Sequence, residues 1–454
     1  MSTPNPSIAT RSPIRHEIVA AARLAAPVSA AHVGQMLMNF VDVMMLGRVS
    51  ELDLAAGALG NSMMFAFTIF PMGVLFAMDP LVAQAWGAGD RERVARHVQR
   101  GLVLAAALSV PLTALLWSTE WIMRLTHQTP EMIDPAAAYV RWVGVSSLPL
   151  LLFIALRQGL QARSLVKPAL VAAVVGNLVN FLANYALIFG HFGFPALGVV
   201  GSAYSTSISR VVMLITLGLV AWRHLRQDFV RVSDVWAWRG YKQILGLGLP
   251  VGWQTSLELW LFSAVALMMG HLGTRELAAH QIALNLAAMA FMVPLGVAGA
   301  AATRVGNAIG RNDQPGAKLS ALVCLGLGAG VMTLSATGFY LAPEFLSRLY
   351  TNEAPVIALA VTLIPVAALF QVVDGLQVVG MGVLRGTADT RFPALIALFG
   401  YWGIGLPCAW FLAFHTSLGP RGTWLGLTAG LASVAVMLLL RIRWRFSQRL
   451  VAVE

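Results

Sequence analysis

The sequence contains few charged residues and almost no cysteine. Charged residues make up 11% of the 454 residues, against roughly 25% in soluble domains. The two cysteines, Cys324 and Cys408, both lie inside apolar segments. They offer no disulfide framework, no metal-ligand cluster and no evident thiol nucleophile. Residues 1–17 are polar and lack an apolar stretch before a cleavage site, so we expect no cleavable signal peptide.

Apolar residues are abundant instead. They make up 58% of the chain, and apolar runs of about twenty residues, the length that spans a bilayer, recur throughout. The sequence therefore predicts an all-α, multi-pass membrane protein with twelve transmembrane helices, whose partner is the lipid bilayer. Basic residues gather in alternate loops, such as 91–100 and 223–241, which places both termini in the cytoplasm. The net charge of +11 thus reflects topology, and we expect no nucleic-acid partner.

The chain repeats itself at an offset of 223 residues. Pro27 returns as Pro250, and the segment Gly87 to Asp90 returns as Gly310 to Asp313. Many secondary transporters are built by internal duplication, with the substrate site where the two halves meet. The repeat predicts two six-helix lobes related by a pseudo-twofold axis along the membrane normal.

The predicted domain boundaries follow from this repeat and from one long cytoplasmic connection. They are a cytoplasmic tail 1–17, an N-lobe 18–222 with spans one to six, a cytoplasmic linker 223–241, a C-lobe 242–441 with spans seven to twelve, and a tail 442–454. The other loops are too short for an extramembrane catalytic domain. With no clustered nucleophile or acid–base set, we expect neither an enzyme nor a bound cofactor.

One candidate site lies in the predicted N-lobe. An ionised side chain near the bilayer centre costs roughly 2.5–3.5 kcal/mol on insertion scales, so Asp42 in span one is a functional candidate. Gln35, Asn39 and Asp42 share one face of that helix. Asn180 and Asn184 form a second polar face in span five, and we expect the two faces to meet across a cavity. Alternatively, the asparagines only join helices, typically with about 0.6 kcal/mol per contact.

The predicted C-lobe carries a second pair of acids, Glu258 in span seven and Asp374 in span ten. Gln281 and Asn285 open span eight and are candidate substrate contacts. Two carboxylates with amide neighbours can bind Na⁺ through hard oxygen ligands, or can hold a proton. The sequence does not choose between these two ions.

Other polar and aromatic residues in the spans have less specific interpretations. We interpret Asp79 as a local ion pair or a water-exposed group, and Arg210 and Arg304 as structural counter-charges or snorkelling groups. The aromatic residues Trp253, Trp260, Phe65 and Tyr401 are candidates for cation–π contacts with a substrate.

These residues stand within strings that resemble the MATE (multidrug and toxic-compound extrusion) transporters, in their bacterial NorM-like branch. The matching strings are Phe40-Val41-Asp42 with Gly47; Leu178-Val179-Asn180 with Asn184-Tyr185; Ala278-Ala279-His280-Gln281 with Asn285; Arg304-Val305-Gly306 with Gly310; and Phe370-Gln371-Val372-Val373-Asp374 leading to Leu384-Arg385-Gly386. The resemblance covers about residues 18–441. It implies a V-shaped pair of lobes that alternates between outward-open and inward-open forms.

The resemblance also implies roles for individual residues. Asp42, Asn180 and Asn184 would form an N-lobe cation or proton site, and Glu258 with Asp374 would form a C-lobe cation site for Na⁺. Similar Na⁺-coupled members carry a tyrosine one turn before the second acid. Phe370 stands at that position here, and the missing hydroxyl weakens the Na⁺ interpretation.

We therefore hypothesise a multidrug efflux antiporter of a bacterial inner membrane, working as a monomer. It would export cationic amphipathic drugs in exchange for Na⁺ or H⁺, with Gln35, Asn39, Gln281, Asn285, Trp253 and Phe65 contacting the substrate. The alternative is a flippase for a lipid-linked oligosaccharide or another amphiphile, although such proteins usually line a cationic cavity. A major-facilitator transporter fits less well, because the glycine of its loop motif would fall on Trp86.

Overall fold

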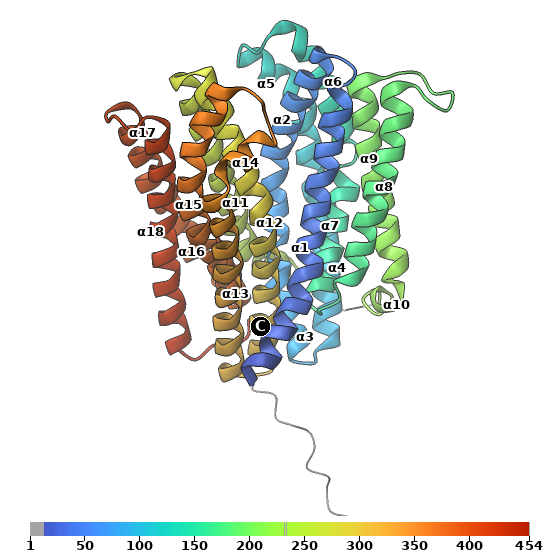
Figure 1. The fold of residues 1–454 in the computed structure, drawn as a ribbon. Helices are drawn as coiled ribbons and strands as arrows, with labels where there is room; N and C mark the ends of the chain where they lie inside the picture. The colour runs from blue at the N-terminus through green and yellow to red at the C-terminus, as the bar shows by residue number, and fades with distance from the viewer. Residues whose placement is uncertain (1–12, 231, 233, 454) are drawn as a thin grey trace, which may run out of the picture.

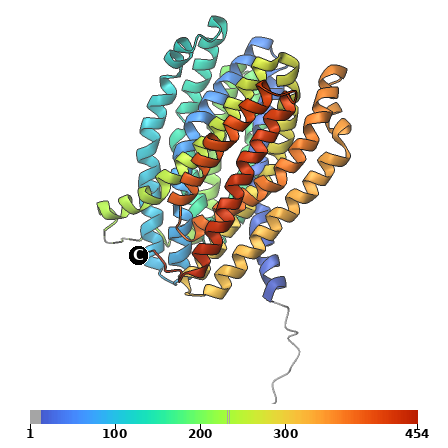
Figure 2. The same ribbon diagram turned by 90° about the vertical axis from the view of Figure 1, so that its left-hand side faces the viewer.

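A computed structural model describes residues 13–230, 232 and 234–453. The described residues form helices and connecting turns, with no strand among them. Figure 1 and Figure 2 show long helices running side by side from one end of the molecule to the other. Pro13, where the first helix begins, and the C-terminal residues lie at the same end, which we call the terminal end.

The helices group into the twelve predicted spans. They are α1 (Pro13–Leu46); α2 (Glu51–Leu75) with α3 (Met78–Gly87); α4 (Arg91–Trp117); α6 (Pro130–Gly144) with α7 (Ser147–Gln161); α8 (Lys167–Phe189); α9 (Gly198–Val220); α11 (Trp238–Leu272); α12 (Thr274–Gly310); α13 (Gln314–Leu341); α15 (Ala354–Gly386); α16 (Arg391–Ala397) with the π-helix η1 (Leu398–Gly405) and α17 (Leu406–Phe414); and α18 (Pro420–Ser447). Short helices α5 (Thr119–Leu125), α10 (Trp222–Leu225) and α14 (Pro343–Arg348) lie in connections.

Most of these spans are apolar enough to cross a membrane by themselves. Among the described residues, ten helices meet the length and hydropathy of a span, or eleven when α6 and α7, bent by 48°, count as one. The remaining one, α1, is 34 residues long but carries the polar face of Gln35, Asn39 and Asp42. Its stability in a bilayer therefore depends on neighbouring helices that cover this face.

The repeated segment Gly87 to Asp90 forms the same turn in both halves. Asp90 caps α4 by accepting a hydrogen bond from the backbone N–H of Arg93 at 2.9 Å. Asp313 caps α13 in the same way, from Gly316 at 2.8 Å. A carboxylate at this position satisfies an N–H group that has no partner within the helix. The repeat in the sequence is thus a repeated helix start.

Two hydrophobic cores define the two lobes. One is built mainly from residues between 261 and 450, on the left in Figure 1, and the other mainly from residues between 38 and 225. The first helix of each half crosses over, because Ala21 of α1 packs in the C-lobe core and Ile244 of α11 packs in the N-lobe core. These two residues are one repeat apart, as expected of a pseudo-twofold axis between the lobes.

The lobes approach each other backbone to backbone at equivalent glycines. A Cβ placed on Gly73 of α2 would lie 2.7 Å from the Cα of Gly252 on α11. A Cβ on Gly296 of α12 would lie 2.7 Å from the backbone nitrogen of Ser29 on α1. The two contacts are equivalent, because Gly296 and Ser29 lie one repeat from Gly73 and Gly252. Small residues at helix interfaces in membranes allow such close approach and the dispersion attraction that comes with it.

The terminal end is closed by a second reciprocal contact and by the C-terminal tail. Gly87 of α3 packs against the carbonyl of Asn307, and Gly310 of α12 packs against the carbonyl of Gln84. The Gln84 side chain donates to the carbonyl of Gly386 at 3.0 Å and accepts from the N–H of Val453 at 2.8 Å. The tail therefore touches both lobes where they meet.

We expect Gly87→Ala to lower the melting temperature of the purified protein in detergent. The added methyl group would meet the Asn307 carbonyl, and overpacking of this kind costs about 1–3 kcal/mol. Gly326→Ala is the matched control, because that glycine is exposed on α13 with no atom near its missing Cβ. Equal melting temperatures for the two variants would contradict the tight contact.

Candidate functional site

The N-lobe residues predicted from the sequence come together around Asp42. Asp42 is 6% exposed, and its Oδ1 accepts a hydrogen bond from Nδ2 of Asn184 on α8 at 2.5 Å. The same Asn184 nitrogen donates to Oδ1 of Asn180, one turn earlier, at 3.1 Å. The polar faces of α1 and α8 therefore meet, but by a direct hydrogen bond and not across a cavity as predicted.

Thr206 of α9 also belongs to this cluster, although it was not predicted from the sequence. Its hydroxyl donates to Oδ2 of Asp42 at 3.3 Å. A signal for it exists in the sequence, because α9 carries several hydroxyl residues, all of which are buried: Ser202, Ser205, Thr206 and Ser209. Two buried polar atoms, Nδ2 of Asn180 and Oδ1 of Asn184, have no hydrogen-bond partner in the described structure. The cluster is thus only partly satisfied by the protein itself.

The C-lobe acids also come together. Glu258 of α11 lies close enough to Asp374 of α15 for the two carboxylates to interact electrostatically. Asp374 is 4% exposed, and its Oδ1 has no hydrogen-bond partner among the described residues. Both side-chain polar atoms of the neighbouring Gln371 are buried and lack partners there as well. Two carboxylates in one apolar bundle repel each other unless a proton or a cation neutralises them.

A phenol from another helix supplies a hydroxyl beside these acids. Tyr401, in the π-helical segment η1, is fully buried, and its oxygen accepts a hydrogen bond from Nε2 of Gln377 at 2.6 Å. Tyr401 also lies within electrostatic range of both Glu258 and Asp374. Phe370 instead packs edge-to-face on Trp424, with ring centroids 5.5 Å apart. The hydroxyl that is missing at position 370 thus has a counterpart at position 401.

Other acids that are shielded from solvent differ from these three because each has an arginine partner: Glu17, Asp79 and Asp228 are buried, and Asp389 is half-buried. Asp79 contacts Arg385 of the other lobe at 3.2 Å and accepts from Gln158 at 2.9 Å. The further pairs are Glu17 with Arg304, Asp228 with Arg163 at 2.7 Å, and Asp389 with Arg441 at 2.8 Å. Asp79 is thus buried in an ion pair and is not water-exposed, but its partner lies in the other lobe, whereas one interpretation predicted a local pair. Arg304 is a counter-charge, as predicted.

In the described part of the chain, no lysine, arginine or histidine lies within 4.0 Å of a carboxylate oxygen of Asp42, Glu258 or Asp374. The described part of the chain also contains no group of three or more His, Cys, Asp or Glu side chains that could hold a metal ion. The oxygens of the two C-lobe acids, with the phenol of Tyr401 and the free carbonyl of Gln377, are nevertheless hard ligands of the kind that Na⁺ prefers.

The predicted substrate contacts fall into two groups. Gln35, Asn39 and Phe65 line one cavity of about 140 Å³ within the N-lobe. Trp253 of α11 packs edge-to-face on Phe70 of α2, with ring centroids 5.5 Å apart, and so lies between the lobes. Gln281 and Asn285 are exposed on α12, outside this cavity. Their role as substrate contacts stays a prediction.

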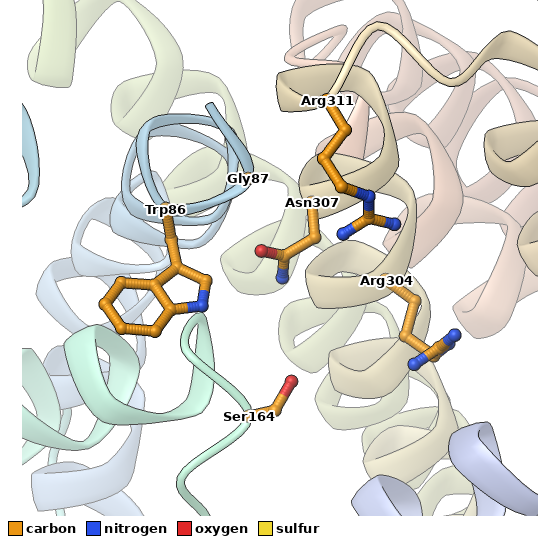
Figure 3. Close-up of a pocket in the computed structure, with 6 residues that line it drawn as sticks. All are labelled: Trp86, Gly87, Ser164, Arg304, Asn307 and Arg311. Carbon is orange, nitrogen blue, oxygen red and sulfur yellow. The ribbon is translucent and has the colours of Figure 1, made fainter. Parts of the chain in front are cut away.

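A second cavity, of about 220 Å³, lies at the terminal end between α3 and α12 (Figure 3). Trp86 and Ser164 lie on one side of it, and Arg304, Asn307 and Arg311 lie on the other. Asn307 donates to the carbonyl of Ala162 at 3.0 Å, which joins the two lobes. This cavity contains none of the predicted site residues and belongs to the closed end of the molecule.

Two related six-helix lobes, each holding buried acids without a basic partner, define a membrane transporter of the internally duplicated kind. The family model for MatE matches residues 27–186 and again residues 250–411, two segments that begin one repeat apart. The chain therefore belongs to the MATE family.

Curated relatives and a solved structure agree with this assignment. The chain is 40% identical over 433 residues to the multidrug resistance protein NorM of Burkholderia vietnamiensis, covering 94% of this chain and 92% of the relative. It is 38% identical over 434 residues to the probable multidrug resistance protein NorM of Bradyrhizobium diazoefficiens, covering 94% and 93%. The crystal structure of the eukaryotic MATE transporter AtDTX14 has the same fold, with a TM-score of 0.87, 23% identity, and coverage of 95% of this chain and 96% of that one.

We expect Tyr401→Phe to destabilise the C-lobe. Without the phenol oxygen, the buried amide of Gln377 loses its hydrogen-bond acceptor, and an unsatisfied buried donor costs about 1–3 kcal/mol. The measurement is the melting temperature of the purified protein in detergent. Tyr340→Phe is the matched control, because that side chain is 68% exposed. A melting temperature that is unchanged in both variants would show that the hydrogen bond is unimportant.

Proposed function

We propose that this protein is a multidrug efflux antiporter that exports cationic amphipathic compounds in exchange for Na⁺ or H⁺. Two observations support this: its curated relatives carry the name multidrug resistance protein, and its spans bury acids without counter-charges. The second observation carries the proposal. A carboxylate is expensive to bury unless something neutralises it, and three such carboxylates in two lobes are a natural place for an exchangeable cation.

The antiport follows from competition for the same negative charges. A drug cation and a coupling ion would both neutralise the same carboxylates, either Asp42 or the pair Glu258 and Asp374. Binding of one cation therefore lowers the affinity of the site for the other. Each ligand shifts the lobes toward the conformation that it binds more tightly. Release of the coupling ion would then favour drug uptake on one side of the membrane, and its return would favour drug release on the other.

The conformational part of the cycle rests on the contacts between the lobes. Gly73 with Gly252, and Gly296 with Ser29, bring the lobes together toward the terminal end. We propose that these contacts separate in the opposite state of an alternating-access cycle. We also propose a bacterial inner membrane, with both termini and the linker 223–241 in the cytoplasm and the monomer as the working unit. The terminal end would then be the cytoplasmic gate, closed in this structure.

Replacing any of the three acids by its amide should abolish drug export. We expect Asp42→Asn, Glu258→Gln and Asp374→Asn each to lose concentrative ethidium efflux, because a neutral amide cannot hold the exchanged charge. The measurement is the ethidium and norfloxacin sensitivity of cells expressing each variant, with protein level checked in membranes. Glu131→Gln, at an exposed acid in the first turn of α6, is the control and should behave like the unaltered protein. Full export by all three site variants would refute this mechanism.

The coupling ion is decided by imposing a Na⁺ gradient and a pH gradient separately on proteoliposomes loaded with drug. Efflux driven by Na⁺ alone would assign the ion to Glu258 and Asp374, with Tyr401 supplying the hydroxyl that Phe370 lacks. Efflux driven only by the pH gradient would make Asp42 the leading proton carrier. If neither the Na⁺ gradient nor the pH gradient drives drug efflux, although the vesicles maintain each gradient, antiport is contradicted.

A further inference from the structure

The N-lobe cavity that holds Gln35, Asn39 and Phe65 has a single charged residue in its lining, Arg210 of α9. Its other polar lining residues are neutral, namely Asn61, Thr68, Tyr139 and Thr206. Most of the remaining lining is apolar, with methionines and aromatic rings such as Met64 and Phe153. The cavity therefore combines apolar and neutral polar groups with one guanidinium in its wall, and Asp42 is not among its lining residues. This polarity is the reverse of what a site for cations alone would need.

The guanidinium of Arg210 is poorly satisfied by the protein. It donates to the hydroxyl of Ser146 at 3.1 Å and to the thioether sulfur of Met64 at 3.1 Å. A guanidinium has five N–H donors, and a thioether is a weak acceptor. In the described structure no carboxylate lies within 4.0 Å of Arg210, unlike Arg163, Arg304, Arg385 and Arg441.

The nearest acid cannot take this role without giving up its own contacts. Asp42 uses one oxygen for Asn184 and the other for Thr206, which stands one turn before Arg210 on the same helix. It influences Arg210 only as a more distant charge. The positive charge of Arg210 is thus presented to the cavity, where burial strengthens its attraction for an anionic group.

We propose that Arg210 is a specificity residue that binds the carboxylate, or a similar anionic group, of zwitterionic amphipathic substrates. Guanidinium and carboxylate form paired, charge-assisted hydrogen bonds of fixed geometry. The volume, about 140 Å³, is comparable with cavities of roughly 150 Å³ that hold benzene. It admits a carboxyl-bearing ring, while the cationic end of the same molecule is left for the unpaired acids. The inference rests on the proposed drug export and adds the substrate class.

Rhodamine B and its ethyl ester are a matched pair of probes. They share the same cationic dye, and only rhodamine B carries a free carboxylate. In cells or proteoliposomes the unaltered protein should export both dyes. We expect Arg210→Met to lower the initial efflux rate of rhodamine B by about tenfold or more, the usual size of a lost charged hydrogen bond. Efflux of the ester should change little, and Arg210→Lys should restore part of the rhodamine B transport.

Arg226→Met is the control for loss of one positive charge, because Arg226 lies in the linker, outside the cavity. It should transport both dyes normally. If Arg210→Met lowers both dyes equally, or neither, the inference is wrong. If the unaltered protein exports the ester but not rhodamine B, the inference fails while the proposed function stands. If it exports neither dye and no ethidium, the proposed function itself fails, and the inference fails with it.

The inference can also be tested by measuring dye binding to the unaltered protein, which does not depend on whether a variant folds. The fluorescence anisotropy of each dye is titrated with purified protein in detergent. Tighter binding of rhodamine B than of its ester would support the inference, because the ester is larger and more apolar and should otherwise bind better. Equal or weaker binding of rhodamine B would contradict it.

Discussion

The cost of an uncompensated charge inside an apolar helix bundle is the constraint on which the structure depends. Most buried acids of this chain meet it with an arginine, as Asp79 does with Arg385 across the two lobes. Asp42, Glu258 and Asp374 do not. Asp42 is bonded by the amide of Asn184 and the hydroxyl of Thr206 instead, while Oδ1 of Asp374 has no hydrogen-bond partner among the described residues. A site of this kind is stable only when a proton or another cation shares it, so its occupancy is coupled to whatever else changes the charge there.

The two lobes use the same backbone for different chemistry. Equivalent glycines and helix caps fix the frame, as the contacts of Gly73 and Gly296 illustrate. The acids do not follow this symmetry. The position equivalent to Asp42 is Val265, a fully buried apolar residue of the C-lobe core, and the position equivalent to Glu258 is Gln35. Duplication therefore supplied the symmetric scaffold, and divergence at single core positions supplied two distinct sites.

The charges of the N-lobe give it a mixed character. Asp42 sits in an amide and hydroxyl cluster, while Arg210 stands one turn from Thr206 and lines the adjoining cavity. The carboxylate of Asp42 and the guanidinium of Arg210 each have other hydrogen-bond partners and do not pair with each other. The N-lobe therefore offers both a negative and a positive group to a ligand. Met64 and Phe65 supply flexible, polarizable apolar surface around them, which suits ligands of varied shape.

The sequence by itself determined the membrane class, the duplication, the two-lobe arrangement and the positions of the three unpaired acids. These depend on hydropathy, on a fixed repeat and on helical spacing, all of which are local along the chain. Tertiary structure alone decided which polar groups meet. Thr206 and Tyr401 join the acids from other helices, Asp79 finds Arg385 in the opposite lobe, and Arg210 faces a cavity rather than a carboxylate. Such pairings depend on how helices rotate and pack, which no spacing within a single helix specifies.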